Sequence, residues 1–79
     1  MNRNNFLLEL DELLELPKGT LKEDQILDKL PEWDSLAVIS FIALADATYK
    51  VNLDPKQLAS CKTIGDLAVQ IEEREKNRT

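Results

Sequence analysis

Histidine is absent from all 79 residues of the sequence. Because histidine is the usual base beside a serine or cysteine nucleophile and a frequent metal ligand, its absence excludes Ser–His and Cys–His pairs, zinc fingers and haem axial histidines. Cys61 is the one cysteine, so no disulfide can form within the chain. We therefore expect a protein that is not an enzyme on its own, and we expect no metal site.

Positive charge is also scarce, with 10 Lys and Arg against 15 Asp and Glu and a formal net charge of −5. A surface of this sign repels phosphate backbones, so we expect no nucleic-acid partner. No apolar run is long enough for a transmembrane helix, and MNRNNFLLEL lacks the apolar region and cleavage site of a signal peptide. We expect no membrane span and a cytoplasmic location, which the unpaired cysteine also favours.

The length fits one small domain, whose stability we expect to be roughly 3–5 kcal/mol. No internal repeat and no Ser/Gly linker divides the chain. We predict a single domain over residues 1–79, with a core from about residue 5 to residue 72 and a polar tail over residues 73–79.

Apolar residues recur at three- and four-residue spacing near the N-terminus, which predicts an amphipathic helix. Asn4 or Asn5 can cap its start, and Pro17 with Gly19 is predicted to end it. The residues expected on its solvent-exposed side are acidic: Glu9, Asp11, Glu12 and Glu15.

A long connection follows and is closed by Pro31. Thr20 and Glu23 have the spacing of a capping box, so a short helical turn through Ile26 and Leu27 is expected after them. Long ordered loops in small domains are often functional.

Asp34 is a suitable N-cap for a second long helix, which is apolar over much of its circumference. Such a helix is either central in a bundle or has a second face for a partner. Asp54 and Pro55 predict the N-cap and first residue of a short helix, and Thr63 with Asp66 predicts the start of the last one. The sequence therefore predicts an all-α bundle of three longer helices and one short helix.

Five residues carry packing expectations. Phe41 and Tyr49 are expected in the core, and Trp33 is expected to pack on the bundle rather than lie exposed. Cys61 is expected to be a small buried residue. Gly65, in the first turn of the last helix, indicates a close approach of backbone there.

The whole layout resembles the acyl carrier proteins. D-S-L at residues 34–36 matches the family's modification motif, an aromatic follows at Tyr49, and V-N-L at residues 51–53 corresponds to the family's V-x-I. T-I-G-D-L at residues 63–67 looks like the family's start of the last helix. D-S-L alone is a weak signal, but these features together at family spacing are specific. The resemblance covers roughly Asn5 to Ile71 and implies an acyl-carrier-like four-helix bundle with a long first loop.

The resemblance implies that Ser35 accepts 4′-phosphopantetheine from coenzyme A, in a reaction catalysed by a phosphopantetheinyl transferase. The terminal thiol of this group would carry an acyl intermediate as a thioester between acyl-loading and acyl-using enzymes. Asp34 would cap the helix and help the transferase orient Ser35, and Leu36 would be an apolar contact for partners. Carriers of this type are usually monomers, so a monomer is expected.

Members of the family carry acids along the exposed side of the second helix, where partner enzymes dock. The docking residues expected here are Leu36, Ala37, Ser40, Ile42, Ala43 and Asp46. Because Asp46 is the one acid among them, we hypothesise that apolar contact dominates and that the acids of residues 23–32 provide attraction. We also hypothesise a dedicated set of partners rather than the general enzymes of fatty acid biosynthesis.

Three functional hypotheses follow. The leading one is a discrete acyl carrier of a specialised lipid, polyketide-like or polysaccharide-linked pathway. The second is an aminoacyl or peptidyl-type carrier loaded by an adenylating ligase, which the missing Gly-Gly pair before the serine disfavours. The third is an unmodified helical adaptor that binds another protein through its apolar second helix and tolerates loss of Ser35.

Overall fold

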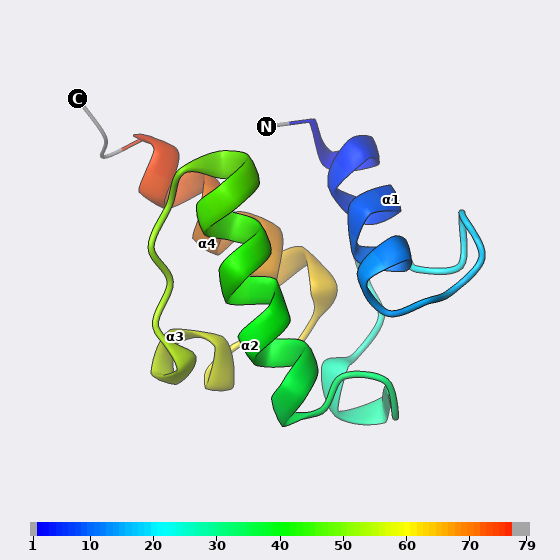
Figure 1. Cartoon of the computed structure of the whole chain (residues 1–79). Coiled ribbons are helices and arrows are strands. Elements are labelled where there is room, and N and C mark those ends of the chain that lie inside the picture. Colours follow the sequence, from blue (N-terminus) through cyan, green and yellow to red (C-terminus); the bar gives the residue numbers. More distant parts are fainter. Residues whose placement is uncertain (1, 77–79) are drawn as a thin grey trace.

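Four helices form the structure, and the computed structural model describes residues 2–76 (Figure 1). α1 spans Arg3–Leu13, α2 spans Ser35–Leu44, α3 spans Pro55–Ala59 and α4 spans Ile64–Lys76. In Figure 1, α1 and α2 lie side by side and run in opposite directions, and α4 passes behind α2. The predicted arrangement of three longer helices, one short helix and a long first loop is confirmed. Within residues 2–76, no helix has the length and apolar character needed to cross a membrane.

The helices pack around one apolar core. Its largest buried apolar side chains come from α1, α2 and α4: Phe6, Leu10, Phe41, Ile64, Leu67 and Ile71. The rings of Phe6 and Phe41 meet edge to face with centroids 6.0 Å apart, and the Trp33 ring packs on Phe41 at 5.7 Å. Such pairs add to the stabilisation from ring burial. The expectations that Phe41 is in the core and that Trp33 packs on the bundle are confirmed.

Both ends of the described chain differ from the prediction. The N-cap of α1 is Asn2, whose side chain accepts a hydrogen bond from the N–H of Asn5 at 3.1 Å. The prediction of Asn4 or Asn5 as the cap is therefore wrong, because both lie inside the helix. At the other end, a polar tail was predicted over residues 73–79. Residues 73–76 are helical and continue α4, and residues 77–79 lie outside the described residues.

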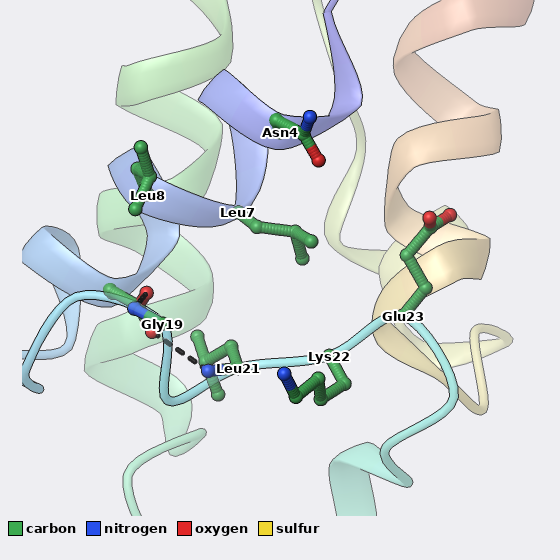
Figure 2. A pocket seen from close by; sticks show the side chains of 8 residues that line it. Asn4, Leu7, Leu8, Gly19, Leu21, Lys22 and Glu23 are labelled. Carbon is green, nitrogen blue, oxygen red and sulfur yellow. Dashed lines mark hydrogen bonds between the residues drawn. The ribbon is translucent and has the colours of Figure 1, made fainter.

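The C-terminal end of α1 is a left-handed turn. The helix stops at Leu13, and Glu15 follows with a φ of 59°. The predicted stop at Pro17 and Gly19 is therefore too late. The turn at Glu15 sends the chain back along α1, so that Gly19 lies beside the helix (Figure 2).

Asp11 holds this returning loop. It is buried, not on the exposed side of α1 as predicted, and its two carboxylate oxygens accept hydrogen bonds from the N–H groups of Gly19 at 2.9 Å and Leu21 at 3.0 Å. A hollow of about 500 Å³ lies between α1 and the loop. Figure 2 shows Leu7 extending from α1 on one side of it and Glu23 lying on the loop on the other.

The capping box predicted at Thr20 and Glu23 does not form. The Thr20 hydroxyl instead donates to the carbonyl of Pro17, three residues earlier. The short helical turn expected near Leu27 is present as a 3₁₀ turn, η1, over Leu27–Lys29. Before it, the N–H of Gln25 donates to the carbonyl of Lys22 in a turn, and Ile26 is extended, where the backbone pairs with another part of the chain.

The segment over residues 23–27 pairs with the start of α4. The N–H of Leu27 donates to the carbonyl of Lys62 at 2.8 Å, and the N–H of Gly65 donates to the carbonyl of Glu23 at 2.8 Å. A Cβ at position 65 would lie 3.2 Å from that Glu23 oxygen, which is tighter than an ordinary contact. The close backbone approach expected at Gly65 is therefore confirmed.

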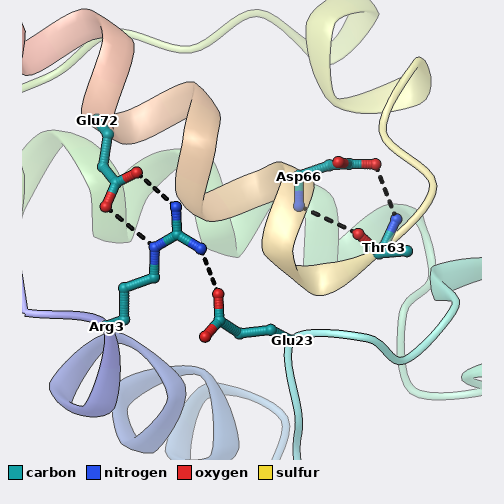
Figure 3. Close-up of polar contacts among 5 residues, drawn as sticks. All are labelled: Arg3, Glu23, Thr63, Asp66 and Glu72. Atoms are coloured by element: carbon teal, nitrogen blue, oxygen red, sulfur yellow. Dashed lines mark hydrogen bonds and ion pairs between the residues drawn. The ribbon is translucent and has the colours of Figure 1, made fainter.

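Arg3 joins three elements at the N-terminal end of α1 (Figure 3). Its Nε and Nη2 donate to the two carboxylate oxygens of Glu72 on α4, at 3.0 and 2.7 Å, and its Nη1 pairs with Glu23 on the loop. The hydrogen bonds from Arg3 hold the pKa of Glu72 below its usual value. Arg3 thereby ties α1 to α4 and to the loop that pairs with the start of α4.

Replacing Arg3 with glutamine is expected to lower the free energy of unfolding at pH 7, but by less than about 1 kcal/mol, because solvent screens pairs that are this exposed. A carboxylate with a depressed folded-state pKa contributes stability above its unfolded pKa and loses it as the pH falls through the folded pKa. The difference between the two proteins should therefore shrink as the pH falls below the unfolded glutamate pKa of about 4.3. Urea unfolding at pH 7 and at a pH well below that value measures the difference, with exposed Arg74→Gln on α4 as the charge-matched control. An equal loss at both pH values would contradict this role of the Arg3–Glu72 pair.

α2 continues without a break into a π-helical segment, η2, over Ala45–Tyr49. Lys50 then ends the helix with a φ of 59°. Tyr49 is half-buried rather than wholly in the core, and its hydroxyl donates to Glu9 Oε1 on α1 at 2.7 Å. Burial and this hydrogen bond raise the pKa of Tyr49, so the hydroxyl stays a neutral donor that holds the end of η2 on α1.

The predicted starts of α3 and α4 are confirmed. The Asp54 side chain accepts from the N–H of Lys56 at 2.8 Å, directly before Pro55 begins α3. Asp66 accepts from the N–H of Thr63 at 3.1 Å, and the Thr63 hydroxyl accepts from the N–H of Asp66 at 3.2 Å. Backbone hydrogen bonds from Lys62 and Thr63 lower the pKa of Asp66, which keeps this cap ionised.

Candidate functional site

Ser35 is the first residue of α2, and its side chain is exposed. Asp34 is the N-cap, as predicted: its Oδ1 accepts from the N–H of Ala37 at 2.9 Å, and its carbonyl accepts from the N–H of Val38 at 3.0 Å. The Asp34 carboxylate is therefore turned into the helix start, while the Ser35 hydroxyl faces solvent at the tip of α2.

The remaining amides of this helix start are free. In the described part of the chain, the N–H groups of Ser35 and Leu36 have no protein acceptor. Free N–H groups and the helix dipole at an N-terminus favour a negative group such as a phosphate. A phosphate ester on Ser35 would therefore lie where the backbone favours its charge.

Trp33 fixes the place of this helix start. Its ring packs on Phe41, two turns further along α2, and its N–H donates to the carbonyl of Leu30 at 3.0 Å. Because Phe41 is wholly buried, the residue two positions before Ser35 is anchored to the core. The site thus combines an exposed hydroxyl with a neighbouring backbone that is anchored to the core.

The outer face of α2 beside Ser35 is apolar. Leu36 is 70% exposed and Ile39 is 63% exposed, the highest values among the large apolar residues that the structure describes. Ala43, one turn beyond Ile39, is also exposed. Two such side chains on one helix face form a surface that another protein can cover.

The predicted docking residues divide between surface and core. Ala37 is 8% exposed and packs in the core, because the i, i+4 spacing from Ala37 to Phe41 turns it inward, so it offers little surface and its docking role stays a prediction. Ile42 is half-buried and packs against the core, and Ser40 is half-buried beside α1. Asp46 is exposed in η2. Ile39 was missed, although its place opposite the core residues of α2 could have identified it.

Within residues 2–76, no side-chain base forms a hydrogen bond with the Ser35 hydroxyl. The sequence contains no histidine, and Asp34 is engaged as the helix cap. The Cys61 thiol is half-buried, and burial raises its pKa, so at neutral pH it is the protonated, unreactive form. The arrangement suits a hydroxyl that receives a group from another enzyme rather than one that attacks a substrate unaided.

Comparison with known families and structures gives one family and one fold. A family model described as phosphopantetheine attachment site matches residues 9–71. The solution NMR structure of a holo acyl carrier protein from Geobacter metallireducens superposes with a TM-score of 0.74 at 21% sequence identity, and the alignment covers 94% of this chain and 86% of that one. No curated protein matches the chain significantly. The matched segment includes Ser35 and extends from the middle of α1 into α4.

Proposed function

Because the chain belongs to the acyl carrier protein family, and is thus a carrier with covalently bound 4′-phosphopantetheine, we propose that Ser35 is the residue that holds this group. The observation that carries the proposal is the exposed Ser35 hydroxyl at the free N-terminus of α2, next to the capping Asp34. We also propose that residues 1–79 act as one discrete carrier domain, monomeric and cytoplasmic, and not as a catalyst.

The residues around Ser35 fit the attached group. In the transfer, the Ser35 oxygen forms the new bond to phosphorus, the pyrophosphate bond of coenzyme A breaks, and the nucleotide leaves while the serine proton passes to the transferase. The free amides of Ser35 and Leu36 would then be available to hydrogen-bond the phosphodiester. When bound, the group supplies a thiol that holds an acyl chain as a thioester. Asp34 keeps the helix start in place, and exposed Leu36 offers an apolar contact to the transferase.

The cargo is proposed to be an acyl intermediate of a specialised lipid, polyketide-like or related pathway. The surface supports a dedicated set of partners, because Leu36 and Ile39 leave the outer face of α2 apolar where Asp46 is the one acid between residues 35 and 49. The alternative cargo is an amino acid loaded by an adenylating ligase, which would use the same Ser35.

Intact mass after incubation with coenzyme A and a broad-specificity phosphopantetheinyl transferase tests the attachment site. The parent is expected to gain one phosphopantetheine and Ser35→Ala none, since no other hydroxyl lies at the start of α2. Ser60→Ala, which removes an exposed serine at the end of α3, is the matched control and should be modified at the parent rate. A folded parent that gains nothing would instead favour the unmodified adaptor.

The modified chain then tests the choice of partners. Offered to a malonyl transferase of general fatty-acid synthesis, it is expected to be loaded far more slowly than that enzyme's own carrier. Equal loading rates would contradict a dedicated set of partners. Loading by an adenylating ligase with an amino acid would favour the aminoacyl alternative.

A further inference from the structure

A groove runs between α1 and α2, starting beside Ser35. One depression, of about 330 Å³, is bordered by Asp34 and Leu36 at the start of α2. A second, of about 450 Å³, extends to Leu44 at the end of α2. Both are lined by Leu13 and Glu15 of the α1 end, so the two depressions adjoin and follow the length of α2, which lies beside α1 in Figure 1.

The groove has an apolar floor and an acidic rim. The apolar residues along it are Leu13, Leu14, Leu36, Ala37 and Leu44. The charged residues that line it in the described chain are all acidic: Glu9, Glu12, Glu15, Glu32 and Asp34. With no lysine or arginine among these lining residues, the rim presents uncompensated negative charge around apolar surface.

Three different elements supply this charge. Glu12 lies on α1 and Glu15 in the turn after it, both exposed, while Glu32 lies in the connection directly before α2. Glu9 on α1 accepts a hydrogen bond from the hydroxyl of Tyr49 at the end of η2. The acids are therefore gathered by the packing of α1 on α2 and not by their order in the sequence. They lie next to an α2 surface that itself offers Leu36 and Ile39 but little charge.

We propose that a partner enzyme docks on this carrier by placing a basic, amphipathic surface helix in the α1/α2 groove, with apolar side chains on the floor and Lys or Arg against the rim. The inference rests on the proposed function, because it names the surface through which the carrier presents Ser35. Acidic charge around an apolar groove attracts and orients a basic partner, and the apolar floor supplies contact once it is bound. The acidic residues of the groove thus provide the electrostatic attraction to a basic partner that the outer face of α2 lacks.

A synthetic amphipathic helix of leucine, lysine and arginine, roughly four turns long, serves as the probe. Amide chemical shifts of the isotope-labelled chain should change along the groove, at Leu13, Ser40 and Leu44. The double variant Glu12→Lys with Glu15→Lys should weaken peptide binding about tenfold or more at low ionic strength, because it reverses two rim charges. Fluorescence polarisation of a labelled peptide measures the affinity.

The matched control is Asp24→Lys with Asp28→Lys, which makes the same change in net charge at exposed positions of the first loop, away from the groove lining. It should weaken binding by no more than about twofold, through the change in net charge alone. Equal weakening by both double variants, shifts centred on residues 23–28, or no saturable binding would overturn the groove. A chain that binds the peptide in the groove but accepts no phosphopantetheine would overturn the attachment at Ser35 and leave the groove as an adaptor's docking site.

Discussion

The Asp11→Ala variant is expected to lose a large part of its folding stability. The carboxylate accepts the N–H groups of Gly19 and Leu21 with its two oxygens, and it is wholly buried. Alanine would leave both donors without this acceptor. Leu21 is buried, whereas Gly19 is exposed beside the hollow, so water can replace the second hydrogen bond but not the first, and the loss should cost about 1.5–3 kcal/mol. A domain of this size has roughly 3–5 kcal/mol in total, so about half of its stability would be lost.

Two further variants separate the carboxylate's hydrogen bonds from its charge. Asp11→Asn keeps the size and one acceptor oxygen, so it should lose about half as much stability as Asp11→Ala. Glu12→Ala removes the same charge from the next, exposed residue of α1 and should change stability by less than about 0.5 kcal/mol. Urea unfolding followed by far-ultraviolet circular dichroism gives the free energies, and hydrogen exchange reports the Gly19 and Leu21 amides directly. If Asp11→Ala is no less stable than Glu12→Ala, Asp11 does not hold the loop.

The helix starts that could be predicted from the sequence are those specified within a few residues. Asp34, Asp54 and Thr63 each accept a backbone N–H two or three residues ahead, as their spacing indicated. Thr20 and Glu23 have the same spacing, yet no helix follows them, because the backbone of that segment pairs with the start of α4 instead. A capping pattern is a local signal, and a tertiary contact overrides it.

Asp11 and Ile39 show that the helix face on which a residue lies predicts its burial better than its residue type does. Asp11 follows Leu7 by four residues and precedes Leu14 by three, so it lies on the apolar stripe of α1, although its charge placed it on the polar side. Ile39 lies opposite Phe41, whose burial fixes the orientation of α2, and an apolar type does not reveal that it is exposed. At both positions the residue type and the helix face predict opposite burial, and the observed burial follows the helix face.

Only part of the candidate site could be predicted from the sequence. Ser35 and its cap follow from the D-S-L motif, because motif and helix start coincide. The acidic groove does not, because Glu12 and Glu32 lie in segments far apart in the sequence that are brought together when α1 packs on α2. The acids of residues 23–32 were expected to attract partners, and of these only Glu32 lines the groove.

Phe41→Ala is expected to remove the structural support of Ser35 together with the core. Phe41 is wholly buried and contacts both Phe6 and Trp33 edge to face. Truncating a buried phenylalanine costs about 3–5 kcal/mol, which equals the expected stability of the whole domain. Trp33 would also lose the ring against which it packs, so the start of α2 would no longer be anchored.

Ile39→Ala is the matched control, because it shortens an apolar side chain of the same helix on the opposite, solvent-exposed face. It should change the free energy of unfolding by less than about 0.5 kcal/mol. Phe41→Ala should give little helical signal at 25 °C and slow modification, whereas Phe41→Leu, which refills part of the cavity, should recover both in parallel. If Phe41→Ala were folded and yet poorly modified, the Trp33–Phe41 contact would position Ser35 for the transferase, beyond its part in stability.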